Sequence, residues 1–263
     1  MPFAMAQGHR IEYELIEAAT AEAPVLVFLH EGLGSVALWQ GFPGRVAAAT
    51  RCGAVVYSRY GYGRSDPLTA RRSVRFMHEE ALEALPGLLD ELGVAAPVLF
   101  GHSDGASIAL IHAGSRCRPV AGVIALAPHV FVEDVTIRSI EAARRAYETT
   151  ELRAKLGRYH ADPDSAFRGW NDVWLDPEFR AWNIEPYLAT VEVPVLAIQG
   201  VDDEYGTLEQ IDRIAQQVAD VEVLTLSGCR HSPHRDQPGA VIESVTRFID
   251  RLRAEHPRPS GAR

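Results

Sequence analysis

The chain has 263 residues, of which 47% are hydrophobic, and it carries a formal net charge of −9. This length and composition are enough for one large domain with a substantial core. The acidic balance argues against nucleic acid or an anionic membrane surface as a partner, because both attract a basic face.

Six short apolar runs, each bounded by glycine, proline or polar residues, predict β-strands. Stretches with helical spacing separate most of these runs, and the apolar stripe from Met77 to Leu92 is the clearest example. Strands that are apolar throughout and alternate with helices predict a doubly wound, mostly parallel sheet with helices on both faces. In such a sheet the functional site lies at the carboxyl ends of the strands. The predicted strands cover residues 25–30, 54–58, 97–101, 121–127, 194–200 and 221–226.

One region, residues 130–188, breaks the alternation because it contains no convincing strand. It holds three of the four tryptophans, Trp170, Trp174 and Trp182. We expect a helical insertion over the strand ends; extra helices packed at the periphery are the alternative. The predicted organisation is a core domain of residues 1–129 and 189–256, the insertion of residues 130–188, and a disordered tail of residues 257–263.

A serine lies between two glycines where the third predicted strand meets a predicted helix. The five residues are Gly101, His102, Ser103, Asp104 and Gly105. A sharp strand-to-helix turn strains the backbone at the serine and leaves no room for side chains two positions away, which accounts for both glycines. The turn exposes a hydroxyl beside a helix N-terminus, whose dipole favours developing negative charge. The pattern predicts a nucleophilic serine; a glycine-rich turn with a capping serine is the alternative.

A serine hydroxyl is a poor nucleophile without a base, and the base needs an acid to orient it. Asp202 and Asp203 follow the fifth predicted strand, and His231 and His234 follow the sixth. A doubly wound sheet would bring both strand ends close to Ser103. The residues alone leave the choice within each pair open.

Five segments make the chain resemble the α/β-hydrolase superfamily over nearly its full length. They are L-H-E-G-L-G-S at 29–35, S-R-Y-G-Y-G-R-S at 58–65, G-H-S-D-G at 101–105, G-V-D-D at 200–203 and H-S-P-H-R-D-Q-P at 231–238. The resemblance implies an eight-stranded sheet, a helical lid after the sixth strand, and a serine–acid–histidine triad. Its G-x-x-D pattern points to Asp203, and its usual histidine position points to His231, although Arg230 stands where the family has glycine.

The tetrahedral oxyanion of such a reaction needs two backbone donors. One is the amide of Asp104, and the resemblance implies that the other is the amide of Gly32. The family usually has glycine where this chain has Glu31, and a carboxylate there would oppose the developing charge. We therefore expect Glu31 to point away and pair with an arginine such as Arg59 or Arg64, or else to hold a water or a substrate group.

Several residues are candidate substrate contacts beside the triad. They are Glu31, His129 at a strand end, and Trp170 and Trp182 of the insertion. An aromatic inner face of the insertion would bury an apolar or aromatic part of a substrate, while packing of the insertion itself is the alternative. The histidines lack the spacing of metal ligands on one helix, so we expect no metal and no other cofactor.

The cysteines Cys52, Cys117 and Cys229 are widely spaced and form no C-x-x-C pair, which indicates neither a zinc site nor a disulfide framework. The first residues contain no apolar signal segment, and no run approaches the ~18 apolar residues of a membrane span. We therefore expect a cytoplasmic protein.

The predicted function is a serine hydrolase that cleaves a small carboxylic ester through an acyl-enzyme intermediate. The same triad could cleave a thioester, a lactone or a carbon–carbon bond next to a ketone. Serine at the nucleophile position argues against the epoxide hydrolases and haloalkane dehalogenases of the superfamily, which use aspartate there. A ligand-binding protein of the same fold without turnover is the alternative of another class, and the sequence leaves the oligomeric state open.

Overall fold

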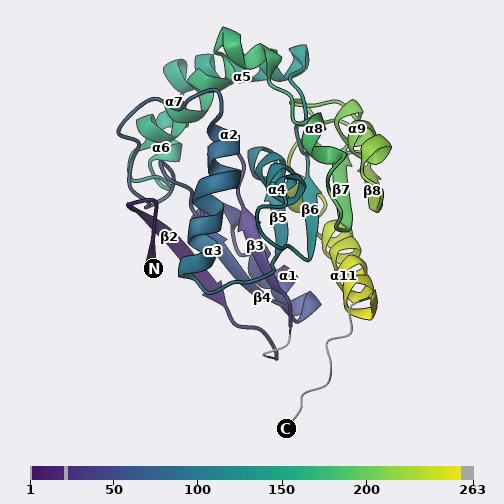
Figure 1. Cartoon of the computed structure of the whole chain (residues 1–263). Helices are drawn as coiled ribbons and strands as arrows, with labels where there is room; N and C mark the ends of the chain where they lie inside the picture. The colour runs from purple at the N-terminus through teal and green to yellow at the C-terminus, as the bar shows by residue number, and fades with distance from the viewer. Residues whose placement is uncertain (1, 21–22, 256–263) are drawn as a thin grey trace.

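The computed structural model describes residues 2–20 and 23–255, and within these ranges eight strands form one sheet (Figure 1). The strand order is β1-β2-β4-β3-β5-β6-β7-β8. β2 pairs antiparallel with β1 and β4, and all other neighbours are parallel. The predicted doubly wound, mostly parallel eight-stranded sheet is confirmed. The strands are β1 (Phe3–Ala6), β2 (His9–Ile16), β3 (Val25–Leu29), β4 (Gly53–Tyr57), β5 (Val98–His102), β6 (Gly122–Leu126), β7 (Val195–Gly200) and β8 (Val221–Leu226).

Helices cover both faces of the sheet, because the central strands are apolar on both sides. In β3, Leu26 and Phe28 belong to the core cluster that includes α1 and α11, whereas Val27 and Leu29 belong to the cluster that includes α3 and α4. The helices are α1 (Phe42–Thr50), α2 (Phe76–Glu79), α3 (Leu85–Glu91), α4 (Asp104–Ser115), α5 (Asp134–Thr149), α6 (Leu152–Leu156), α7 (Pro163–Trp174), α8 (Glu185–Leu188), α9 (Glu209–Gln217), α10 (Pro233–Asp236) and α11 (Pro238–Glu255).

The predicted helical stripe from Met77 to Leu92 forms α2 and α3 with a π-helical turn, η2 (Glu80–Ala84), between them. Pro86 lies at the start of α3 and has no N–H for the preceding turn, so a widened turn is favoured there. Nδ1 of His112 donates to the Ala81 carbonyl at 2.7 Å and satisfies one carbonyl of this turn. The stripe is therefore helical as predicted, but irregular at its centre.

The segment between β6 and β7 contains α5 to α8 and the short 3₁₀ helix η3 (Pro177–Ala181). In residues 130–188 the strand-like pairing is limited to a bridge between Phe131 and Asn183. Figure 1 shows α5 and α7 at one end of the sheet, beyond α2 and α4, with α6 to the side of α2. Because α4 starts directly after Ser103, this end carries the carboxyl ends of the parallel strands.

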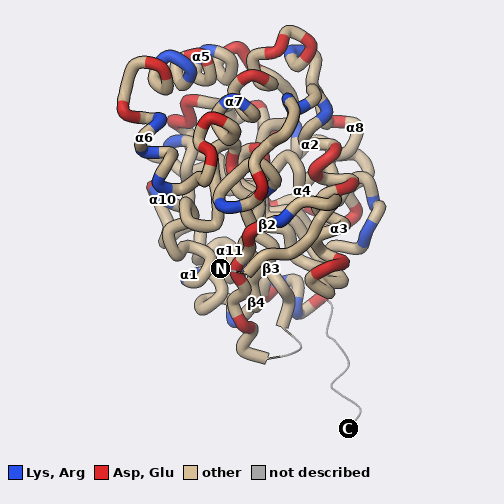
Figure 2. Tube along the Cα trace, turned by 90° about the vertical axis from the view of Figure 1, so that its left-hand side faces the viewer, with Lys and Arg blue, Asp and Glu red and all other residues tan. Residues whose placement is uncertain are grey.

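The charged residues are dispersed over the molecule. Acidic and basic positions are interspersed along the chain trace in Figure 2, and α5 alone carries several of each sign. None of the helices in residues 2–20 and 23–255 has the length and apolar character needed to cross a membrane. The predicted tail, residues 257–263, lies outside the described residues.

Candidate active site

Ser103 lies at the turn between β5 and α4 with φ of 52° and ψ of −119°, a strained conformation for a residue with a side chain. A methyl group on Gly101 would come within 2.3 Å of the Gly105 carbonyl oxygen. One on Gly105 would come within 2.1 Å of the Leu29 carbonyl oxygen. The two glycines thus permit a turn that presents the Ser103 hydroxyl at the amino end of α4.

Ser103, His231 and Asp203 form one continuous chain of hydrogen bonds. Oγ of Ser103 lies 3.0 Å from Nε2 of His231, and Nδ1 of His231 lies 2.9 Å from each carboxylate oxygen of Asp203. A proton on Nδ1 lets the ring donate to Asp203 and leaves Nε2 free to accept the serine proton. The three residues follow β5, β7 and β8, so the parallel sheet brings them together from distant parts of the sequence.

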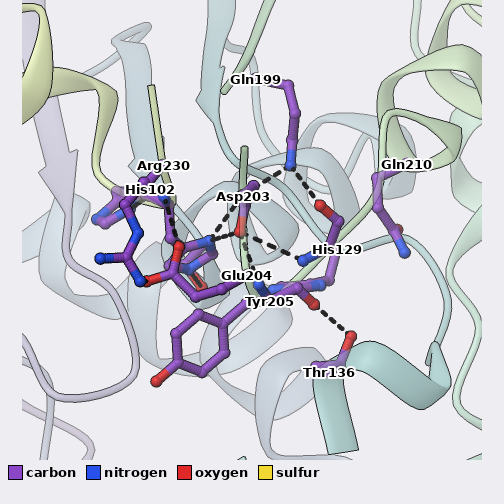
Figure 3. Close-up of polar contacts among 12 residues, drawn as sticks. His102, His129, Thr136, Gln199, Asp203, Glu204, Tyr205, Gln210 and Arg230 are labelled. Carbon is purple, nitrogen blue, oxygen red and sulfur yellow. Dashed lines mark hydrogen bonds and ion pairs between the residues drawn. The ribbon is translucent and has the colours of Figure 1, made fainter. Parts of the chain in front are cut away.

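Asp203 is fixed by donors other than the histidine (Figure 3). Its buried carboxylate accepts from Nε2 of Gln199 at 2.7 Å and from the amide of Tyr205 at 2.8 Å. Burial alone would raise the pKa of this carboxyl, but the charge and hydrogen bond of His231 and the Tyr205 amide hold it below its ordinary value. The alternative acid, Asp202, is exposed, and its amide donates to the Cys229 carbonyl.

His231 is the base that this arrangement offers. Burial alone would lower the pKa of its ring, but Asp203 outweighs this effect, with smaller contributions from Glu204 and Glu31, and raises the pKa above its ordinary value. The alternative histidine, His234, is buried against the rings of Trp39 and His102, at centroid distances of 5.0 and 4.8 Å. His234 does not line the cavity that contains Ser103 and His231.

The amide of Gly32 is oriented by the carbonyl that precedes it. The Glu31 carbonyl oxygen accepts from Nδ1 of His30 at 2.6 Å, from the Gly34 amide at 3.0 Å and from Nη2 of Arg59 at 3.0 Å. The proton is on Nδ1 of His30 because Nε2 accepts from the Arg59 amide at 3.0 Å. In a trans peptide the N–H points opposite to the C=O, so the Gly32 amide points away from this buried cluster.

Asp104 provides the second predicted donor amide, at the first position of α4, where a helix has no acceptor for it. Its buried carboxylate accepts from Nε1 of Trp174 at 3.1 Å and lies 3.9 Å from Nη2 of Arg59. Burial raises the pKa of this carboxyl, and Arg59 and Trp174 oppose that effect. The fully buried Arg59 therefore contacts the loop of one predicted oxyanion donor and approaches the side chain of the other.

Glu31 lines the cavity beside Ser103, and its carboxylate lies next to His102 of the nucleophile turn. One oxygen lies 3.5 Å from Nδ1 of His102 and the other 3.7 Å from Nη2 of Arg235. Burial opposes its ionisation, but His102 holds the pKa of this carboxyl well below its usual range. The expectation of Arg59 or Arg64 as the ion-pair partner is wrong, because Arg59 bonds to the carbonyl of Glu31 and Arg235 lies beside its carboxylate.

A cavity of about 100 Å³ lies beside Ser103, bounded on one side by the core and on the other by α5 and α7. Trp170 lines it and packs so closely on Gly32 that a methyl group there would lie 2.1 Å from the indole Nε1. His129 also lines it, and burial lowers the pKa of that ring to about 3. Trp182 does not line this cavity, because it stacks on Phe179 at 5.3 Å, and its contact with a substrate stays a prediction.

Several residues at the site were not predicted from the sequence. The sequence marks Trp174 only as one of the tryptophans of the insertion, yet its indole N–H donates to Asp104. Thr136, Ile140 and Tyr205 also line the cavity. Tyr205 could have been found, because it follows the G-x-x-D segment by two residues. Thr136 and Ile140 carry no comparable signal, because a helix of the insertion brings them to the site.

Other possible sites are less supported. A larger cavity, about 660 Å³, lies at the amino ends of the strands, between Pro24, Val98 and Pro194, and includes no triad residue. Within residues 2–20 and 23–255, no group of three or more histidine, cysteine, aspartate or glutamate side chains is placed to hold a metal ion. The cavity at Ser103 is therefore the site where reactive groups converge.

Comparisons with known proteins agree with this architecture. No curated protein matches the sequence. The solved structure of VinJ is 23% identical, with a TM-score of 0.76 over 95% of this chain and 98% of that one. The enol-lactonase from Burkholderia xenovorans LB400 is 18% identical, with a TM-score of 0.75 over 95% and 100% of the two chains. A structure from work on carboxylesterases of Nitrososphaera gargenis is 16% identical, with a TM-score of 0.77 over 97% and 100%.

At these identities the likeness to solved structures speaks for the fold alone. The sequence itself matches a family model described as the alpha/beta hydrolase family over residues 26–244, which is most of the chain. This protein therefore belongs to the alpha/beta hydrolase family.

Proposed function

We propose that this hydrolase cleaves small carboxylic esters through an acyl-enzyme on Ser103. The observation that carries the proposal is the unbroken path from Asp203 through His231 to Ser103, with contacts of 2.9 and 3.0 Å. Gly32 and Asp104, whose amides are the proposed oxyanion donors, line the same cavity. A nucleophile, its base and two backbone donors at one cavity are the groups that acyl transfer requires.

In the proposed reaction Ser103 Oγ attacks the ester carbonyl carbon while His231 Nε2 takes the hydroxyl proton. The oxyanion that forms is held by the amides of Gly32 and Asp104. Collapse of the tetrahedral intermediate breaks the bond to the alkoxide, which receives the proton from His231. Water then attacks the acyl-enzyme by the same steps and releases the carboxylic acid, which regenerates Ser103.

The dimensions of the cavity support a small acyl group. Its volume of about 100 Å³ is below the ~150 Å³ of a protein cavity that accommodates benzene. Ile140, Trp170 and Trp174 make its wall largely apolar. We therefore propose a substrate with a short apolar acid part, and expect faster hydrolysis of acetyl and butyryl esters than of octanoyl or longer esters.

Lactones are the alternative substrate, because one similar structure is that of an enol-lactonase and the same steps would open a lactone ring. A panel of nitrophenyl esters of rising acyl length, acyl thioesters and lactones separates these classes. Ser103→Ala should abolish hydrolysis of the preferred substrate and labelling by a fluorophosphonate probe. Wild-type turnover in that variant, or labelling that does not require Ser103, would reject the proposal.

A further inference from the structure

The main chain of His231 is held on both sides by side chains that the triad does not use. Its amide donates to Oε2 of Glu204 at 3.3 Å. Its carbonyl oxygen accepts from Nε2 of His102 at 2.7 Å. The other ring nitrogen of His102 lies 3.5 Å from Oε2 of Glu31. Both polar backbone groups of the predicted base are therefore engaged by side chains from other segments, the end of β5 and the loop after β7.

Each of the two glutamates is also matched with an arginine from the segment that carries His231. Arg230, directly before it, pairs with Glu204 at 3.0 Å, and Arg235, in α10, lies 3.7 Å from Glu31. Figure 3 shows Arg230, Glu204 and His102 together on one side of Asp203. Arg230 occupies the position where the sequence departs from the family glycine.

We propose that Glu31, His102 and Glu204 form a brace that positions the catalytic base, His231. The inference rests on the proposed function, since it assigns a role to the loop of that base. The three members come from three different connections, after β3, at the nucleophile turn and after β7. The brace therefore joins the loop of Gly32, after β3, and the loop of Asp203, after β7, to the loop of His231, after β8.

The loop that carries His231 needs such a brace because regular secondary structure does not fix its position. Between β8 and α10 the chain has no regular secondary structure, so the loop of His231 has few ladder hydrogen bonds to fix it. A displacement of about 1 Å in a reacting group can lower turnover on the order of 10²-fold. Side-chain bonds to the amide and the carbonyl fix the peptide planes on both sides of His231, and so the direction in which its ring leaves the backbone.

The brace also has an electrostatic consequence that distinguishes it from ordinary packing. Both glutamates stabilise the protonated ring and contribute to the raised pKa of His231. Loss of either negative charge should therefore lower that pKa and move the acid limb of the pH–rate profile to lower pH. The titratable and charged groups around the ring are Glu31, Asp104, Asp203, Glu204, Tyr205, His102, His129, His234, Arg230 and Arg235.

The test compares Glu204→Gln with Glu204→Ala, and Glu31→Gln with Glu31→Ala. The glutamine at 204 removes the charge but keeps an oxygen that can accept from the His231 amide, whereas alanine removes both. We expect all four variants to move the acid limb to lower pH. We expect kcat on the high-pH plateau to stay within about twofold for Glu204→Gln and to fall about tenfold for Glu204→Ala.

The matched control is Glu243→Gln, which breaks an exposed ion pair with Arg247 on α11, away from the site. It should leave both the acid limb and kcat at wild-type values. Active enzyme is counted by fluorophosphonate titration, so partial misfolding does not mimic a loss of kcat. Equal kcat for Glu204→Ala and Glu204→Gln would overturn the positioning role, as would an acid limb that none of the four variants moves.

One readout does not depend on turnover. The ring of His231 can be titrated by NMR in a Ser103→Ala background, with and without Glu204→Gln. A lower ring pKa with the second substitution supports the brace even if no tested ester is hydrolysed, in which case only the proposed function fails. An unchanged ring pKa counts against the brace whatever the substrate proves to be.

Discussion

A methyl group on Gly32 would occupy space that the indole of Trp170 already fills. It would lie 2.1 Å from Nε1 and 2.3 Å from Cδ1, whereas carbon atoms in contact are about 3.5–4.0 Å apart. Gly32 does not have a positive φ, so its backbone accepts alanine and the obstacle is the tryptophan. Either Trp170 or the loop that carries Gly32 must therefore move by more than 1 Å, because 2.1 Å is well short of the roughly 3.5 Å of a normal contact.

The expected cost follows from which of the two moves. Overpacking alone costs about 1–3 kcal/mol of stability. If the loop moves, the Gly32 amide is displaced from its proposed role as an oxyanion donor, and loss of such a donor lowers kcat about 10²–10³-fold. We expect Gly32→Ala to lower kcat/KM for a short-chain nitrophenyl ester by about 10²-fold, with fluorophosphonate labelling slowed in parallel.

The steric cause can be tested by removing the tryptophan. Trp170→Ala takes away the atoms that a methyl group would meet, so the double variant should be at least ten times more active than the two single effects predict. That coupling corresponds to about 1.4 kcal/mol or more. Gly44→Ala is the matched control, because beyond the adjoining backbone of α1 no atom lies within 4 Å of a methyl group there. Additive effects of the two substitutions at 32 and 170 would refute the reasoning.

Four further outcomes are expected. Because the pKa of His231 is raised and its neutral ring is the proposed base, wild-type kcat/KM should fall as pH decreases through a value above ~6.5; a limb well below 6 would contradict this assignment. Burial lowers the pKa of His234 to about 2, so the unfolded chain takes up a proton near pH 6.5 and the native protein does not. His234→Phe should therefore gain stability over wild type by about 1.4 kcal/mol per pH unit below ~6.5, and denaturant unfolding that gives a constant difference would exclude this linkage. Gly105→Ala places a methyl group 2.1 Å from the Leu29 carbonyl oxygen, so it should yield little soluble protein, and a wild-type Tm would argue against the turn geometry. Trp174→Phe removes the donor to buried Asp104 and should cost about 1–3 kcal/mol in chemical denaturation, with an unchanged midpoint as the contrary result.

The parallel part of the fold follows from the sequence, because β3 to β7 are apolar, buried runs with turn residues at their ends, and β8 is a β-branched run despite Glu222 and Thr225. The antiparallel β1 and β2 do not, since β2 carries polar residues such as Arg10, Glu12 and Glu14 among its apolar ones. The eight-strand count came from the family resemblance. At the site, local spacing picks out Ser103 and its turn.

Partners that are distant in sequence could not be predicted in the same way. Arg235 is 204 positions from Glu31, and nothing in the local sequence of either residue indicates the other. The aromatic residues of the insertion that line the cavity could not be predicted either. The composition shows that the insertion is rich in aromatic residues but does not indicate which ring faces the cavity. Trp170 lines the cavity and Trp182 stacks within the insertion, a difference set by how the helices rotate on the core.

The buried guanidinium of Arg59 links two segments at the base of the cavity, since it donates to the Glu31 carbonyl and lies 3.9 Å from the Asp104 carboxylate. The triad residues and Gly32 each follow a strand of the sheet. The side of the cavity that faces them is formed by α5 and α7, which lie in one contiguous stretch, residues 136–174. Substitutions in residues 136–174 would therefore reshape the cavity without changing the residues that follow the strands.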